Sequence, residues 1–150
     1  MSSDPASRET RRSPQAGDAL PTLTRQITQE KINLYAAASG DFNPLHVDPE
    51  FARQTPFGGT IAHGMMGVAF ISSLLTAWAG EEWVKRGKVR VRFVRPMRPG
   101  DTVVVRGQIT AVKEEGEDWM CGCRVECVNQ DGKVVVEGWA SVPIRCESRG

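Results

Sequence analysis

The side chains best suited to chemistry lie in one short stretch of this chain, residues 40–66. Asp41, Asn43 and His46 fall within six residues, and Pro44 biases the residue before it away from the helical region. A turned segment of this kind can bring a carboxylate and an imidazole to one water and move its proton. Asp41 and His46 are therefore candidate acid–base residues. A turn-forming Asp and a hydrogen-bonded loop His remain open alternatives, and Asn43 could either orient the pair or only form a turn.

The second candidate is the sequence His63-Gly64-Met65, at the start of the most apolar helix expected in the chain. The first N–H groups of a helix lack internal partners and carry the positive end of its dipole. Gly64 would let a carbonyl oxygen approach that backbone closely, so that an enolate forming there would be stabilised. Alternatively, the glycine only permits tight packing, and His63 only hydrogen-bonds to backbone.

A helix is expected to end directly before Asp41. Thr28 is a suitable N-cap residue, and Gly40 suits the left-handed residue that closes a helix. The sequence therefore predicts a helix over about 29–39 that places Asp41 in irregular backbone.

The remaining elements are a buried helix and a set of strands. Residues 61–79 are apolar nearly all round, which is typical of a helix buried on every side; two glycines and a histidine near its start argue against a membrane span. From Gly87 the apolar period changes to two, and Asp131-Gly132 is a hairpin signal. Strands are expected near residues 88–93, 102–112 (with Gly107 as a bend or bulge), 119–129 and 133–144, with a short strand at 20–24.

Four long strands with tight connections imply an antiparallel meander. Wrapped over one buried helix, it gives an α+β fold. Such a sheet leaves open edges, so we expect a homodimer.

Length, charge and cysteine spacing limit the function classes. The 150 residues suit one domain, residues 20–150, preceded by a loose polar tail at 1–19. A net charge of +1 gives no basic field for nucleic acid, and without an apolar leader segment we expect a cytoplasmic protein. No second Cys/His pair has zinc-ligand spacing, so we interpret the cysteines as free thiols: Cys121, Cys123, Cys127 and Cys146.

The densest basic group lies at the end of the first long strand and in the turn after it. A solvated sheet face explains these residues best, and the alternative is contact with the nucleotide phosphates of a carrier. The group comprises Arg90, Arg92, Arg95 and Arg98.

Three segments give the sequence a family resemblance. Residues 40–48 (GDFNPLHVD) and 61–65 (IAHGM) closely resemble the MaoC-like, (R)-specific enoyl-CoA hydratase family, and residues 95–102 resemble its strand-turn-strand segment. The resemblance implies a hot-dog fold, in which an antiparallel sheet wraps a long central helix, usually in a dimer. It also implies reversible hydration of a trans-2-enoyl-CoA to a (3R)-3-hydroxyacyl-CoA, or of the acyl-carrier-protein thioesters, without a metal or organic cofactor.

The resemblance also assigns roles. Asp41 and His46 would hold the catalytic water, the Gly64 N–H would bind the thioester carbonyl, and Asn43 would support the pair. Two other functions stay in competition: a hot-dog thioesterase, disfavoured because residues 65–79 contain no acidic side chain, and a non-catalytic acyl-thioester-binding subunit. The expected substrate-binding residues are Asn43, Gly64, Met65, His63 and Phe57.

Overall fold

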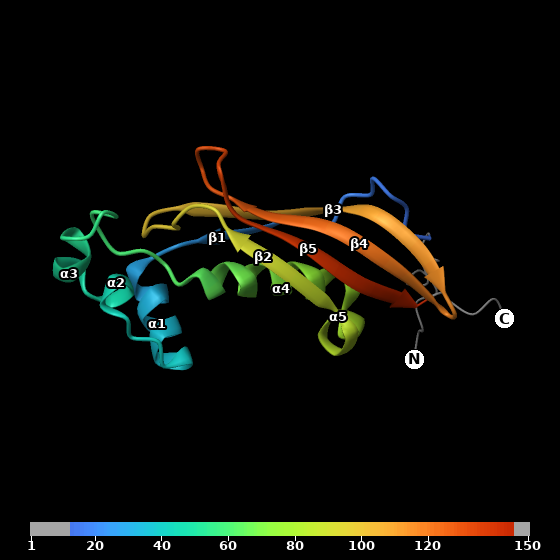
Figure 1. The fold of residues 1–150 in the computed structure, drawn as a ribbon, viewed down its shortest axis with the longest axis horizontal. Coiled ribbons are helices and arrows are strands. Elements are labelled where there is room, and N and C mark those ends of the chain that lie inside the picture. The colour runs from blue at the N-terminus through green and yellow to red at the C-terminus, as the bar shows by residue number, and fades with distance from the viewer. Residues whose placement is uncertain (1–12, 146–150) are drawn as a thin grey trace, which may run out of the picture.

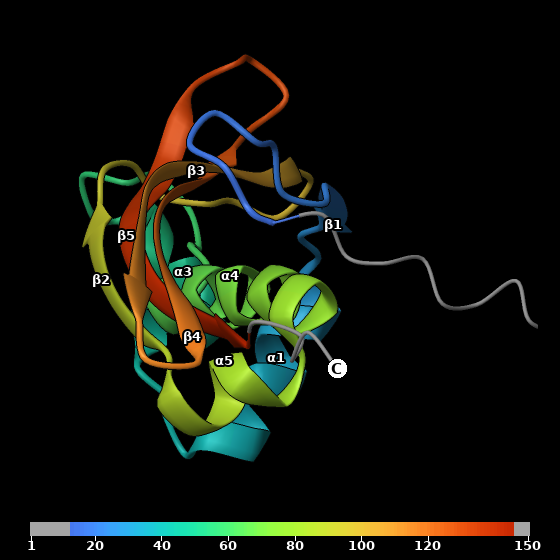
Figure 2. The same cartoon turned by 90° about the vertical axis from the view of Figure 1, so that its right-hand side faces the viewer.

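One long helix lies along the concave face of a five-stranded antiparallel sheet. The structure is a computed structural model and describes residues 13–145. The sheet has the strand order β1-β3-β4-β5-β2, and Figures 1 and 2 show it curving around helix α4. The expected α+β hot-dog architecture is therefore confirmed.

The elements follow the order expected from the sequence, which includes a short helix that starts after Asp48 and runs to about Arg53; the short helices at Pro44–Val47 and Glu81–Arg86 are additional. The helices are α1 (Gln29–Ser39), α2 (Pro44–Val47), α3 (Pro49–Arg53), α4 (Gly64–Ala79) and α5 (Glu81–Arg86). The strands are β1 (Leu23–Gln26), β2 (Lys88–Phe93), β3 (Thr102–Glu115), β4 (Asp118–Val128) and β5 (Val134–Arg145).

Capping residues fix the backbone on both sides of the candidate site. Thr28 caps α1 by accepting a hydrogen bond from the Lys31 N–H, and Gly40 ends that helix with φ = 77°. Asn43 then caps α2, and Asp48 caps α3. Three helix ends within a short stretch therefore hold the loop between α1 and α2 in place.

Helix α4 is more exposed than its composition suggests. It begins at Gly64 rather than near residue 61, and His63 precedes it without a side-chain cap. Six of its residues are buried against the sheet, whereas Met65 is 54% exposed. The prediction of burial on every side is wrong for this single chain, since one face of the helix remains open.

The sheet corrects two further expectations. The register of β3 against β4 shifts between Ile109 and Ala111, so the bulge lies at Thr110 and not at Gly107. Gly107 instead binds the segment that precedes β1: its carbonyl oxygen accepts a hydrogen bond from the Leu20 N–H at 2.9 Å. The Gly17 N–H also bonds to β3, at 2.8 Å. The loose tail expected up to residue 19 is therefore attached at its end, and residues 1–12 lie outside the described residues.

Helix α5 was not expected, and it is held from two sides. The buried Trp83 donates its ring N–H to Ser72 of α4 at 3.0 Å. Arg86 donates to Asp118 at the start of β4 at 2.7 Å and also pairs with Glu82. The Arg86 guanidinium lowers the pKa of the Asp118 carboxyl.

The cysteines on β4 belong to the core. The three thiols are free and buried on one face of the strand, and burial raises their pKa values to about 11 or 12. They are Cys121, Cys123 and Cys127, whereas Cys146 lies outside the described residues. Within residues 13–145, no helix combines the length and apolar character needed to cross a membrane.

Candidate active site

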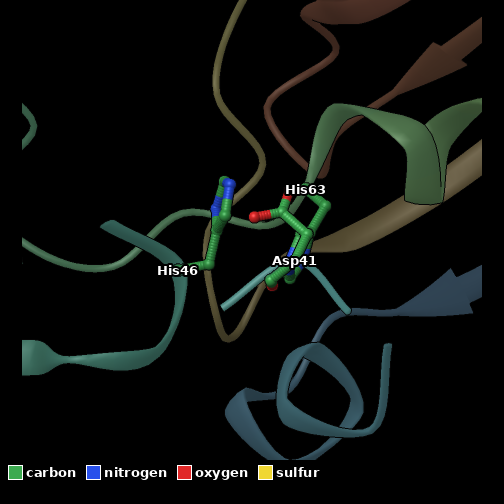
Figure 3. A group of neighbouring side chains, drawn as sticks. All are labelled: Asp41, His46 and His63. Atoms are coloured by element: carbon green, nitrogen blue, oxygen red, sulfur yellow. The ribbon is translucent and has the colours of Figure 1, made fainter. Parts of the chain in front are cut away.

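Asp41 lies in the loop directly after α1, with its carboxylate held locally. Its Oδ1 accepts the Asn43 N–H at 3.2 Å, and its own N–H bonds to the Ser39 hydroxyl at 3.2 Å. Figure 3 shows the carboxylate pointing toward the imidazole of His46. The segment thus presents an exposed carboxylate to an imidazole of the following short helix.

His46 has one ring nitrogen committed and one free for chemistry. Its Nδ1 lies 2.8 Å from the Ile61 carbonyl oxygen. A carbonyl oxygen only accepts, so Nδ1 carries the hydrogen and Nε2 keeps its lone pair in the neutral ring. This is the tautomer that a proton acceptor requires.

The backbone of His46 is anchored by two partly buried side-chain hydrogen bonds. The Gln29 amide of α1 donates to the His46 carbonyl oxygen at 2.8 Å. The same amide accepts from the Thr60 hydroxyl at 2.6 Å. These two bonds connect α1, α2 and the segment before α4, so that His46 does not depend on its own short helix alone.

His63 lies against both residues from within the protein. Its ring stacks on that of His46, with centroids 4.0 Å apart and an angle of 28° between the planes. Its Nε2 lies 2.9 Å from the backbone carbonyl oxygen of Asp41. The three side chains form the cluster drawn in Figure 3, with one potential ligand atom of each within 4.8 Å of the others.

By distance alone this cluster could attract a metal ion, but its geometry fits one poorly. His46 and His63 each have one ring nitrogen engaged by a backbone carbonyl, an arrangement that metal-bound histidines also show. Their ring planes differ by 28°, whereas the lone pairs of metal-bound imidazoles must converge on one point. The orientation of the rings, and not the set of donor atoms, therefore disfavours a metal ion here.

A cavity of about 440 Å³ opens beside His46. Four of the predicted site residues line it, namely His46, Phe57, Gly64 and Met65, whereas Asp41, Asn43 and His63 do not. Asn43 instead caps α2, with its Oδ1 accepting from the Leu45 N–H at 3.0 Å. The remaining lining residues are Ile61, Ala62, Phe93, Val94, Arg95, Pro96, Met97 and Val136.

Gly64 lies at the N-terminus of α4 and on the cavity wall. A Cβ at this position would lie 2.9 Å from the ring of Phe93, so only glycine fits without displacing that ring. The N–H groups of the first helical turn have no intrahelical acceptor. The cavity therefore has positive backbone dipoles on one wall and the His46 ring on another.

Sequence reasoning missed most of the far wall of the cavity. Phe93 and Val94 at the end of β2, Met97 in the following turn and Val136 on β5 approach α4 only through the fold. Of the arginine group, Arg95 lines the cavity, while its guanidinium donates to the Val134 carbonyl oxygen at 2.8 Å. The other arginines have surface roles: Arg90 lies over Trp139, Arg92 pairs with Glu137, and Arg98 bonds to the Phe57 carbonyl oxygen.

The sequence profile of the MaoC like domain matches residues 12–125, a span that includes Asp41, His46, α4 and most of the sheet. This chain belongs to the MaoC-like family. The MaoC-like chain is 35% identical over 127 residues to an (R)-specific enoyl-CoA hydratase of Rhodospirillum rubrum, which covers 82% of this chain and 83% of that protein.

Two further comparisons concern Aeromonas caviae. Its (R)-specific enoyl-CoA hydratase is 32% identical over 126 residues, which covers 81% of this chain and 90% of that protein. The solved structure of the (R)-hydratase from A. caviae involved in PHA biosynthesis superimposes with a TM-score of 0.75 at 29% identity, covering 88% of this chain and 98% of that chain. The similarity therefore extends over nearly the whole MaoC-like domain.

Proposed function

We propose that this protein is a hydro-lyase that interconverts trans-2-enoyl thioesters and (3R)-3-hydroxyacyl thioesters, with coenzyme A or an acyl carrier protein as the carrier. The observation that carries the proposal is that the His46 ring and the N-terminus of α4 line one cavity, with the Asp41 carboxylate beside His46. The names of the related hydratases support the reaction class.

The acid–base pair would act on one water. In the hydration direction, one member takes a proton from the water while its oxygen forms a bond to C3 of the enoyl group. The electron pair of the C2=C3 bond moves toward the thioester carbonyl, and the other member, which starts protonated, gives its proton to C2. The free Nε2 lone pair of His46 suits proton uptake from water. Which member protonates C2 is left open.

The N-terminus of α4 would stabilise the charge that develops on the thioester oxygen. Gly64 is the first residue of a 16-residue helix and lines the cavity, so its N–H lies at the positive end of the helix dipole. A preorganised backbone donor of this kind stabilises an enolate oxygen more than the ground-state carbonyl. Acid–base groups and carbonyl donor would thus act on opposite ends of the conjugated system.

The proposal needs no metal and no organic cofactor, because coenzyme A belongs to the substrate and water is the second reactant. We further propose a homodimer, since α4 exposes one face in the single chain and β1 and β2 form the edges of the sheet among the described residues. A cytoplasmic location is proposed from the sequence alone. A light-scattering measurement of the mass in solution tests the dimer, and a monomer would contradict it.

The direct test is hydration of crotonyl-CoA and longer enoyl-CoAs, followed by loss of absorbance of the conjugated thioester. Wild-type protein should remove the absorbance, and Asp41→Asn and His46→Ala should each lower the rate by at least about 10²-fold. Chiral analysis of the product tests the (R) configuration. No hydration by wild type, or full rates in both variants, would refute the proposal. Release of free thiol from an acyl-CoA in the same samples would instead indicate a thioesterase.

A further inference from the structure

The proposed mechanism leaves one buried polar side chain without a task. His63 is 2% exposed and does not line the cavity. Its Nδ1 is buried and has no hydrogen-bond partner among the described residues. A buried imidazole usually costs stability unless its polar atoms are satisfied, so the position of His63 requires an explanation.

Its contacts are directed at both members of the acid–base pair. The Nε2–H of His63 points at the Asp41 carbonyl oxygen at 2.9 Å, and the face of the ring lies 4.0 Å from that of His46. The ring of His63 also lies against the ring of Tyr35 on α1, with the two ring centroids 4.7 Å apart. One side chain at the end of the segment before α4 therefore contacts the Asp41 backbone and the His46 ring together.

We propose that His63 is a positioning residue that sets the Asp41 loop and the His46 ring relative to each other. The inference rests on the proposed function. The hydrogen bond fixes the backbone from which the Asp41 carboxylate projects, and the stacking limits the orientation of His46. Asp41 lies in the loop after α1 and His46 lies in the short helix α2, so a side chain that contacts both influences their separation directly.

The contacts also assign opposite tautomers to the two histidines. His46 donates from Nδ1 to the Ile61 carbonyl oxygen, whereas His63 donates from Nε2 to the Asp41 carbonyl oxygen. A hydrogen on Nδ1 of His63 would be buried without an acceptor among the described residues, which is unfavourable. His63 should therefore keep its hydrogen on Nε2 while His46 keeps Nε2 free.

Two variants separate the hydrogen bond from the ring. His63→Phe keeps a planar ring against His46 but removes the donor, and His63→Gln restores an N–H donor near the position of Nε2. We expect kcat to fall by about 10²-fold in His63→Phe, since a displacement of about 1 Å can cost that much. KM should stay within about threefold, because the cavity wall is unchanged. The kcat of His63→Gln should exceed that of His63→Phe by at least about tenfold.

Trp83→Phe is the matched control. It also removes one buried ring N–H donor, the bond to Ser72, in a part of the fold away from the cavity. It should lower the melting temperature without lowering kcat. If His63→Phe keeps wild-type kcat, or if Trp83→Phe loses as much kcat as His63→Phe, the positioning role is refuted. If His63→Phe does not fold, His63→Gln is compared with wild type alone. A fall in kcat matched by a rise of the same factor in KM would then refute the positioning role.

A test without substrate distinguishes this inference from the reaction class. The sequence contains two histidines, so ¹⁵N spectra of histidine-labelled full-length protein contain few ring signals. At about pH 8.5, above the ordinary imidazole range, one ring should show the Nδ1–H form and the other the Nε2–H form, and His63→Phe should leave the Nδ1–H ring. An Nδ1–H form for His63 would overturn the positioning role, whereas absence of hydration would overturn the proposed function only.

Discussion

Gly64→Ala tests the carbonyl site at the N-terminus of α4. A Cβ built on Gly64 lies 2.9, 3.0 and 3.1 Å from three atoms of the Phe93 ring. Both residues line the cavity, so the new methyl group would occupy space between the cavity and the first helical turn. The ring of Phe93 is 54% exposed and can move outward, so we expect the protein to fold.

The effects on stability and on activity should differ in size. Overpacking costs about 1–3 kcal/mol, and alanine in place of glycine in a helix returns up to about 1 kcal/mol. The free energy of unfolding should therefore fall by no more than about 3 kcal/mol. Loss of one oxyanion donor costs about 10²–10³ in kcat. Because alanine keeps the N–H but obstructs the approach to it, kcat/KM should fall by about 10- to 100-fold.

The assay is hydration of crotonyl-CoA at several substrate concentrations, with urea unfolding of the same samples. Gly122→Ala is the control, because a Cβ there meets its nearest neighbours at an ordinary 3.7 Å and lies outside the cavity. Phe93→Ala combined with Gly64→Ala distinguishes the two causes of a loss. Recovery in the double variant identifies the displaced ring, and no recovery identifies the obstructed N–H.

A wild-type kcat/KM for Gly64→Ala would refute the placement of the thioester carbonyl at this helix start. The same conclusion would follow if Gly122→Ala lost as much activity, since the effect would then belong to any added methyl group.

The remaining predictions concern stability and thiol reactivity. Gly40→Ala should lower the free energy of unfolding by about 1 kcal/mol in urea titrations, because φ is 77° there; unchanged stability would contradict this helix end. Asp118→Asn should lower the melting temperature at pH 7, and the difference from wild type should shrink as the pH is lowered through the acidic range. The folded-state pKa of Asp118 is depressed by Arg86, so its contribution exists above the unfolded pKa and is lost as the pH falls through the folded pKa; a difference that grows as the pH falls would refute this. The buried β4 thiols of Cys121, Cys123 and Cys127 have raised pKa values and should resist iodoacetamide at pH 8 until the protein unfolds. Mass spectrometry of the peptides shows which cysteines are alkylated. Alkylation of these three cysteines in the native protein would contradict their burial.

Local signals were enough to predict most of the fold. Capping by Thr28, termination at Gly40 and the change of apolar period after Gly87 each depend on neighbours in sequence, and the structure confirms the elements they indicate. The wrong or missing predictions concern elements whose local structure depends on tertiary packing. Gly107 was interpreted as a bulge because the sequence does not show that Leu20 packs over it. Helix α5 was missed although its first turn is acidic and its last turn basic; the helix is short and is held by contacts with α4 and β4.

The candidate site was predictable where it is continuous in sequence. The turn that brings Asp41 near His46 follows from Gly40 and Pro44, and the Gly64 helix start follows from the apolar run after it. The far wall was not predictable, because Val136 reaches the cavity only through the register of β5 against β2 and β4. The contact of His63 with the Asp41 carbonyl oxygen likewise depends on two loops meeting in space.

The position of Val136 near the end of the chain has a consequence for synthesis on the ribosome. The acid–base loop and the apolar helix α4 leave the exit tunnel well before β5, so the nascent chain must carry that helix without the strands that cover it. Contacts between segments far apart in sequence form late and slowly. Truncation before β5 should therefore yield an aggregation-prone chain that binds chaperones, even though every residue proposed for the chemistry has already been translated.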